Sequence, residues 1–158
     1  MITLDKYWKQ RDVCYATQCT QEIRDNAVRT VSLVNKMLDM VYGDTGLVFD
    51  KVNSGWRPTQ VNDGTSNSSI VSKHLTAQAC DIGDNEDRIL ARWCLANRDV
   101  LARLGLYMED PRWTPTWVHV QWISPGSGNR VYIPSTNSPK TAALSKWKRG
   151  DDLRLEVT

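Results

Sequence analysis

The stretch Ser72-Lys73-His74-Leu75-Thr76-Ala77-Gln78-Ala79-Cys80-Asp81 decides how the chain is read, because it holds one of only two histidines in 158 residues. Six residues separate His74 from Asp81, and the other histidine, His119, lies far downstream in Trp117-Val118-His119-Val120-Gln121. Two histidines and an aspartate form a three-ligand set that suits a catalytic zinc, whose fourth position stays open for water. We therefore expect the fold to bring His74, Asp81 and His119 together.

Residues 78–82 have the composition of a strand, in which successive side chains point to opposite faces. Asp81 then shares a face with Ala77 and Ala79, whereas Cys80 points the other way. His74 precedes this strand in a loop, so we expect the chain to turn once between the two ligands.

The same alternation in residues 117–123 places Trp117, His119 and Gln121 on one face. Gln121 is a candidate to hydrogen-bond the substrate or a group behind the ligands. Trp117 either lines the cleft or packs in the core.

Periodicity and turn residues predict the remaining elements. Thr20 is expected to cap a long amphipathic helix that Gly43 ends, and Asp84 or Asn85 is expected to cap the next helix. Helices are expected over residues 4–9, 20–42 and 86–104, and strands over residues 47–52, 78–82, 106–109, 117–123 and 130–133.

This order of elements favours an α+β fold, with a small antiparallel sheet and helices packed on one face. The polar segment 59–69 is expected to be an exposed loop. A chain of 158 residues suits a single domain spanning residues 1–158, with a polar tail from about 134 and a short helix near 141–147.

Composition and charge exclude several classes of protein. The net charge of +2 and the absence of a basic cluster with interleaved aromatics argue against nucleic-acid binding. No window approaches the ~18 apolar residues that span a membrane, and the first residues lack the pattern of a signal peptide. We therefore expect synthesis in the cytoplasm, no membrane insertion and reduced thiols at Cys14, Cys19, Cys80 and Cys94.

Four motifs, in this order, carry a family resemblance. Ser54-Gly55-Trp56-Arg57, Ser72-x-His74, Ala79-x-Asp81 and Trp117-Val118-His119 together resemble the zinc D-alanyl-D-alanine carboxypeptidase family. That family includes phage and bacterial L-alanyl-D-glutamate endopeptidases, which cut the stem peptides of peptidoglycan. The resemblance runs from about residue 20 to 133 and implies a fold like that of Hedgehog and the D-Ala-D-Ala peptidases.

Carried over to this chain, the resemblance implies zinc ligands at His74, Asp81 and His119. Arg57 matches the arginine that pairs with a substrate carboxylate, a task that suits the planar fork of a guanidinium. Ser72 matches the motif serine, which hydrogen-bonds the substrate or orients the loop. The implied protein is a monomeric, phage-endolysin-like hydrolase that reaches the cell wall through holin-type release or as part of a virion.

The chain departs from the family pattern at two positions. Ala77 replaces the motif glycine, which matters if the backbone there has a positive φ. Thr116 stands where the family often has an acidic residue, three before the last histidine. If residues 110–116 close a hairpin that pairs Glu109 with Trp117, Glu109 lies diagonally from His119 and is the expected general base. Asp110 is the alternative general base, but in that register its side chain would point to the opposite face from His119.

Two other functions remain open. Loss of the usual base at Thr116 would leave a zinc-containing, non-catalytic module that binds cell wall or a protein partner, as part of a virion. A thiol hydrolase built on Cys80 and a histidine is the third alternative, although strand alternation points Cys80 away from Asp81.

Overall fold

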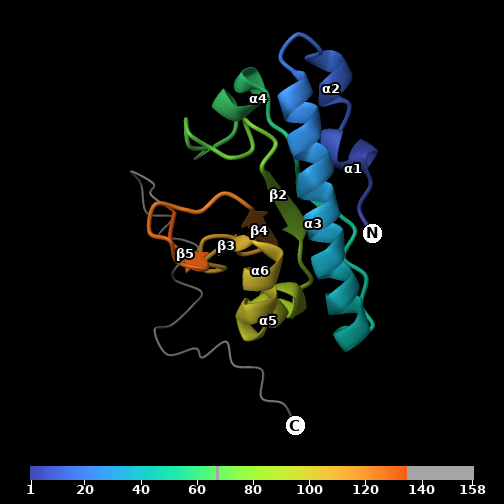
Figure 1. Ribbon diagram of the computed structural model, residues 1–158, viewed down its shortest axis with the longest axis vertical. Helices are drawn as coiled ribbons and strands as arrows, with labels where there is room; N and C mark the ends of the chain where they lie inside the picture. Colours follow the sequence, from blue (N-terminus) through green and yellow to red (C-terminus); the bar gives the residue numbers. More distant parts are fainter. Residues whose placement is uncertain (67, 135–158) are drawn as a thin grey trace.

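A computed structural model of the chain describes residues 1–66 and 68–134, which form an α+β fold around a mixed five-stranded sheet (Figure 1). The helices are α1 Leu4–Trp8, α2 Arg11–Cys14, α3 Gln21–Thr45, α4 Thr59–Asp63, α5 Ile89–Ala96 and α6 Arg98–Leu104. The strands are β1 Val52–Ser54, β2 Ala79–Gly83, β3 Tyr107–Glu109, β4 Trp117–Gln121 and β5 Val131–Tyr132. The predicted α+β class is confirmed. The predicted tail and its helix over residues 141–147 lie outside the described residues.

The sheet has the strand order β1-β2-β4-β3-β5. All neighbours are antiparallel except β3 and β5, which are parallel, so the prediction of a wholly antiparallel sheet is wrong. The reason is topological. β4 already has β2 and β3 on its two edges, so the chain that leaves β4 can add a strand only at an outer edge. It adds β5 beside β3, where the chain direction is parallel.

Helix α3 begins as predicted, because the Thr20 side chain accepts a hydrogen bond from the backbone N–H of Ile23. It ends later than predicted. The helix continues through Gly43 and stops at Gly46, whose φ of 69° gives the left-handed conformation common after a last turn. Its predicted apolar stripe is buried in the core and comprises Ala27, Val31, Val34, Leu38 and Val41.

The single helix predicted over residues 86–104 is two helices, α5 and α6, which meet at Asn97. Asn97 has φ −111° and ψ 43°, outside the helical region, and its side chain donates to the carbonyl of Trp93. The predicted N-cap, Asp84 or Asn85, is wrong in position, because α5 begins at Ile89 and its N-cap is Arg88. Both predicted residues nevertheless bond the first turn of α5. The buried carboxylate of Asp84 accepts from the backbone N–H groups of Leu90 and Ala91, and Asn85 accepts from Ile89.

Two shorter segments also differ from expectation. Only the last residue of the strand predicted over 47–52 is in a strand, because β1 starts at Val52. The predicted loop 59–69 opens with the short helix α4, which follows Pro58.

The two faces of the sheet differ sharply in composition. One face packs against the helices and is apolar, with Cys80, Ile82, Met108, Val118 and Val120 all fully buried. The opposite face carries the side chains of Asp81, His119 and Gln121, as alternation requires. Among the described residues, no helix is long and apolar enough to cross a membrane.

Candidate metal centre

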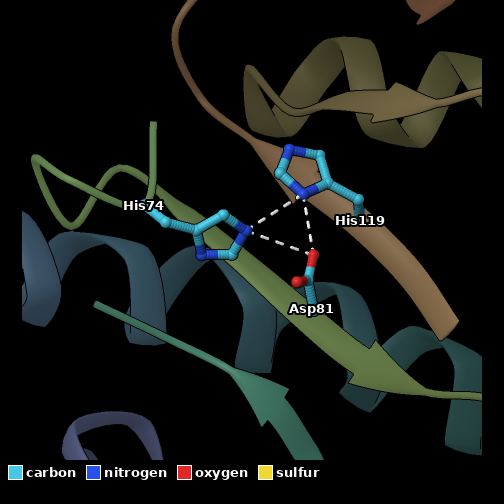
Figure 2. A group of neighbouring side chains, drawn as sticks. All are labelled: His74, Asp81 and His119. Carbon is cyan, nitrogen blue, oxygen red and sulfur yellow. Dashed lines mark hydrogen bonds and ion pairs between the residues drawn. The ribbon is translucent and has the colours of Figure 1, made fainter. Parts of the chain in front are cut away.

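Asp81 and His119 form a directly opposed cross-strand pair between β2 and β4. Opposed residues of an antiparallel pair share a face and lie within side-chain reach of each other. His74 joins them from the turn that precedes β2, as Figure 2 shows. The Nε2 atom of His74 lies 3.3 Å from Nδ1 of His119 and 3.2 Å from Oδ1 of Asp81, and Nδ1 of His119 lies 2.7 Å from the same Oδ1. The predicted convergence of the three residues is therefore present.

The turn that carries His74 ends as helices commonly end, although it contains no helix. The N–H of Gln78 donates to the carbonyl of Lys73, and the N–H of Ala77 donates to the carbonyl of His74. Ala77 has a φ of 56°, the left-handed region in which glycine is usual. The missing motif glycine therefore does matter to the backbone. The hydroxyl of Thr30 on α3 donates to the carbonyl of Ala77 at 2.7 Å and holds this strained residue.

The other ring nitrogen of His74 is held by Gly55. Nδ1 lies 2.7 Å from the Gly55 carbonyl, which can only accept a hydrogen bond, so Nδ1 carries the proton and Nε2 offers its lone pair to the cluster. Gly55 is required here for space, since a Cβ would lie 2.1 Å from the carbonyl oxygen of Tyr7. The Ser54-Gly55-Trp56-Arg57 motif thus orients a ligand through its backbone.

The electrostatics of the cluster favour an ionised Asp81. Burial raises the pKa of Asp81, but its interactions with His74 and His119 outweigh burial and hold this pKa well below its usual value. Burial lowers the pKa of His74, which favours the neutral imidazole that binds metals. Burial also disfavours a charged His119, but the hydrogen bond to Asp81 prevails and raises the pKa of His119.

The donor set fits a metal ion. His74, Asp81 and His119 each offer one ligand atom, and these atoms lie within 4.8 Å of one another. Donors around a tetrahedral zinc are roughly 3.3 Å apart, given bonds of about 2.0–2.2 Å. Two of the three separations, 3.3 and 3.2 Å, meet this value, and the 2.7 Å separation needs only a small opening. The residues can therefore hold a metal ion.

Arg57 lies beside this cluster. Its backbone N–H donates to the carbonyl of His74, and its guanidinium donates to the Ser72 hydroxyl at 3.3 Å. Its buried Nε has no hydrogen-bond partner among the described residues. Burial lowers the pKa of Arg57, and the charges of Asp81 and Glu109 offset only part of this shift. Arg57 and Ser72 are thus brought to the site that the sequence predicted for them.

Glu109 also reaches the site, in a different register from the predicted one. Tyr107 pairs with Gln121 and Met108 with Val120, so the register carries Glu109 opposite His119, not opposite Trp117. The predicted pairing is wrong by two residues because residues 110–116 close the connection with two turns in place of a regular hairpin. The shift of two keeps Glu109 on the predicted face and brings it closer to His119. The charge of Glu109 contributes to the raised pKa of His119.

The remaining candidates take different places. Asp110 is engaged by Arg112, which donates to both of its carboxylate oxygens. Trp117 is half-buried at the start of β4, on the same face as His119. Cys80 is fully buried on the other face, and burial raises the pKa of its thiol, so the structure gives a Cys80 nucleophile no support.

Sequence reasoning missed two contributors to the site. Tyr132 on β5 lies edge-on to His119, with ring centroids 6.5 Å apart, but no motif surrounds it and only the parallel pairing with β3 brings it there. Thr30 lies on α3, 44 or more residues from each ligand in sequence, and nothing in its helical context signals the contact with Ala77.

Comparisons of the chain with protein-family models, with curated proteins and with solved structures found no match.

Proposed function

We propose that the chain is a zinc-dependent peptidase that hydrolyses a peptide bond in the stem peptides of peptidoglycan, with a fold of the Hedgehog and D-Ala-D-Ala-peptidase type. The observation that carries the proposal is the convergence of His74, Asp81 and His119, beside Arg57 and Glu109, on one face of the sheet. The order of the motifs in the sequence supports the same family.

Zinc is the metal we propose, because two imidazoles and one carboxylate are a donor set it favours and three protein ligands leave a position open. When bound at such a site, zinc supplies Lewis-acid activation of water and of a carbonyl group. The hydrogen bond from His74 to the Gly55 carbonyl supports this role, since metal-binding histidines commonly donate their other N–H to an acceptor.

Glu109 is proposed as the general base. It accepts a proton from the attacking water and passes it to the departing amine nitrogen, so that one water is consumed and a carboxylate and an amine appear. Its place opposite His119 in the register supports this role. Asp110 is the weaker candidate because its carboxylate is bound by Arg112.

Arg57 is proposed to bind a carboxylate of the substrate. Its guanidinium is half-buried and has a buried Nε without a partner among the described residues, a state that an incoming carboxylate relieves. Ser72 orients the guanidinium through the 3.3 Å hydrogen bond. Trp117 is proposed as a wall of the substrate cleft, on the face of His119.

The deciding experiment treats purified peptidoglycan with the zinc-loaded chain and measures new amino groups and free D-alanine. We expect Glu109→Gln to lower the rate by about 10²–10⁴-fold, the usual contribution of a general base, while zinc content stays unchanged. Asp110→Asn is the matched control, because it removes a neighbouring carboxylate that faces Arg112. Free D-alanine identifies a carboxypeptidase, whereas new amino groups without it identify an endopeptidase.

The same experiment separates the enzyme from a binding module. A parent chain that binds zinc and sediments with peptidoglycan, yet releases neither product, contradicts the hydrolase and favours the module. Equal losses in the Glu109 and Asp110 variants contradict the role of Glu109.

A further inference from the structure

The orientation of the Gln121 side-chain amide is dictated by its neighbours. Its Nε2 lies 2.6 Å from the carbonyl oxygen of Ile123, and its Oε1 lies 2.9 Å from the Tyr132 hydroxyl and 3.4 Å from Nε2 of His119. A backbone carbonyl only accepts hydrogen bonds, so the NH₂ end of the amide must face Ile123. The oxygen is left to face His119 and Tyr132, and the reverse orientation would set two acceptors against each other.

This orientation decides which nitrogen of His119 is turned away from the cluster. The amide oxygen of Gln121 has no proton to give, so Nε2 of His119 must carry one and donate it. Nδ1 faces Asp81 and Nε2 of His74, and a metal ion bound there would replace the proton that Nδ1 shares with Asp81. His74 has the opposite arrangement, with Nδ1 held by the Gly55 carbonyl. The two histidines therefore turn different ring nitrogens toward the cluster.

Tyr132 strengthens the arrangement from the edge strand. Its hydroxyl donates to the same amide oxygen, and its ring lies edge-on to His119 at an interplanar angle of 83°. Gln121 and Tyr132 are both buried, so water does not compete for these contacts. The 3.4 Å separation between Gln121 and His119 makes that contact the weakest of the three that the Gln121 amide forms.

We propose that Gln121, held by Ile123 and Tyr132, is a positioning residue that presents Nδ1 of His119 to the metal. The inference rests on the metal site of the proposed function, and it is independent of hydrolysis. Partners behind a ligand commonly change metal affinity by 10–100-fold, and the long contact here places the expected effect near the lower figure.

The first test identifies the ligating nitrogens. The chain has only two histidines, so ¹⁵N-histidine spectra of the zinc-loaded protein contain two rings to assign. We expect one ring bound through Nε2 and one through Nδ1. Two rings bound through Nε2 would overturn the proposal.

The second test measures zinc affinity by competition with a chromophoric chelator. Gln121→Leu keeps the bulk but removes the acceptor, and we expect about 10-fold weaker binding and a broadened Nδ1-bound signal. Gln121→Glu keeps an acceptor oxygen for His119 but sets its other carboxylate oxygen against the Ile123 carbonyl, so we expect it to restore only part of the affinity. Tyr132→Phe leaves Gln121 held by Ile123, and we expect a change below about 3-fold.

Asn35→Leu is the matched structural control. Asn35 is a half-buried amide that bonds the backbone N–H and carbonyl of Ile2, and Ile2 is no part of the metal cluster. We expect this control to lower the melting temperature without changing zinc affinity. Parent-like affinity in Gln121→Leu overturns the proposal while leaving the peptidase untouched. Conversely, a parent that binds zinc through Nδ1 of His119 but cuts nothing refutes only the peptidase.

Discussion

The two faces of β2 and β4 are made by alternate residues of the same strands, yet one stabilises the fold and the other gathers the side chains that could hold a metal ion. Asp81 faces His119, whereas its neighbour Ile82 is fully buried against the helices. Because the side-chain period of a strand is two, a step of one residue changes the environment completely. Substitutions at adjacent positions should therefore affect separate properties.

The largest expected effect follows from Asp81→Asn, which removes the only carboxylate among the three ligands. We expect zinc affinity to fall by at least about 100-fold, because a neutral amide is a far poorer zinc ligand than a carboxylate. Zinc at about 1,000 times its dissociation constant stabilises a protein by roughly 4 kcal/mol. A variant that binds 100-fold more weakly is then at about 10 times its own dissociation constant, and it should lose roughly 2.7 kcal/mol of this stabilisation. The measurement is the melting temperature with zinc and with a chelator.

The parent supplies the control for this experiment, since chelation should lower its melting temperature much more than that of Asp81→Asn. A variant that zinc stabilises as much as it stabilises the parent would show that the metal binds elsewhere.

An effect of another kind, on the fold and not on zinc affinity, is expected one residue along the chain. Ile82→Ala removes a fully buried side chain from the core and should cost about 2–5 kcal/mol of unfolding free energy. Zinc affinity, measured below the unfolding transition, should stay within about 3-fold of the parent because the methyl groups lie on the other face. A parallel loss of affinity would mean that the two faces are coupled through the strand.

The contrast between the two faces could be predicted from the sequence, because the alternation of side chains around Asp81 and His119 depends only on local sequence. The apolar stripe of α3 and the cap at Thr20 could be predicted for the same reason. The stop at Gly46 could not, since Gly43 offers the same residue type three positions earlier. The two glycines differ only in how the last turn of the helix packs, which the sequence pattern does not reveal.

What escaped prediction depended on contacts between distant segments. The register that carries Glu109 opposite His119 depends on how residues 110–116 fold, and no repeat or turn motif there specifies it. The parallel pairing of β5, and with it the approach of Tyr132 to Gln121, follows from which sheet edges remain open. The three residues that converge at the site could thus be named from the sequence, while the groups that orient them could not.

The smallest effect is expected at the turn that brings His74 to the polar face. Ala77 has a φ of 56°, which costs a non-glycine residue roughly 1–2 kcal/mol. Ala77→Gly removes this strain but loses a buried methyl group and makes the unfolded chain more flexible. We expect a net gain of about 0.5–1 kcal/mol, measured by urea denaturation with an unchanged m value.

Ala79→Gly is the matched control for this substitution. Ala79 is equally buried but lies within β2 and is not among the residues with positive φ. Glycine there relieves no strain and should destabilise the fold by about 1 kcal/mol. If both variants lose stability alike, the backbone at Ala77 is not strained, and the hydroxyl of Thr30 that holds its carbonyl is then an ordinary core hydrogen bond. Opposite signs instead show that the turn stores strain to aim His74 at the metal-binding face.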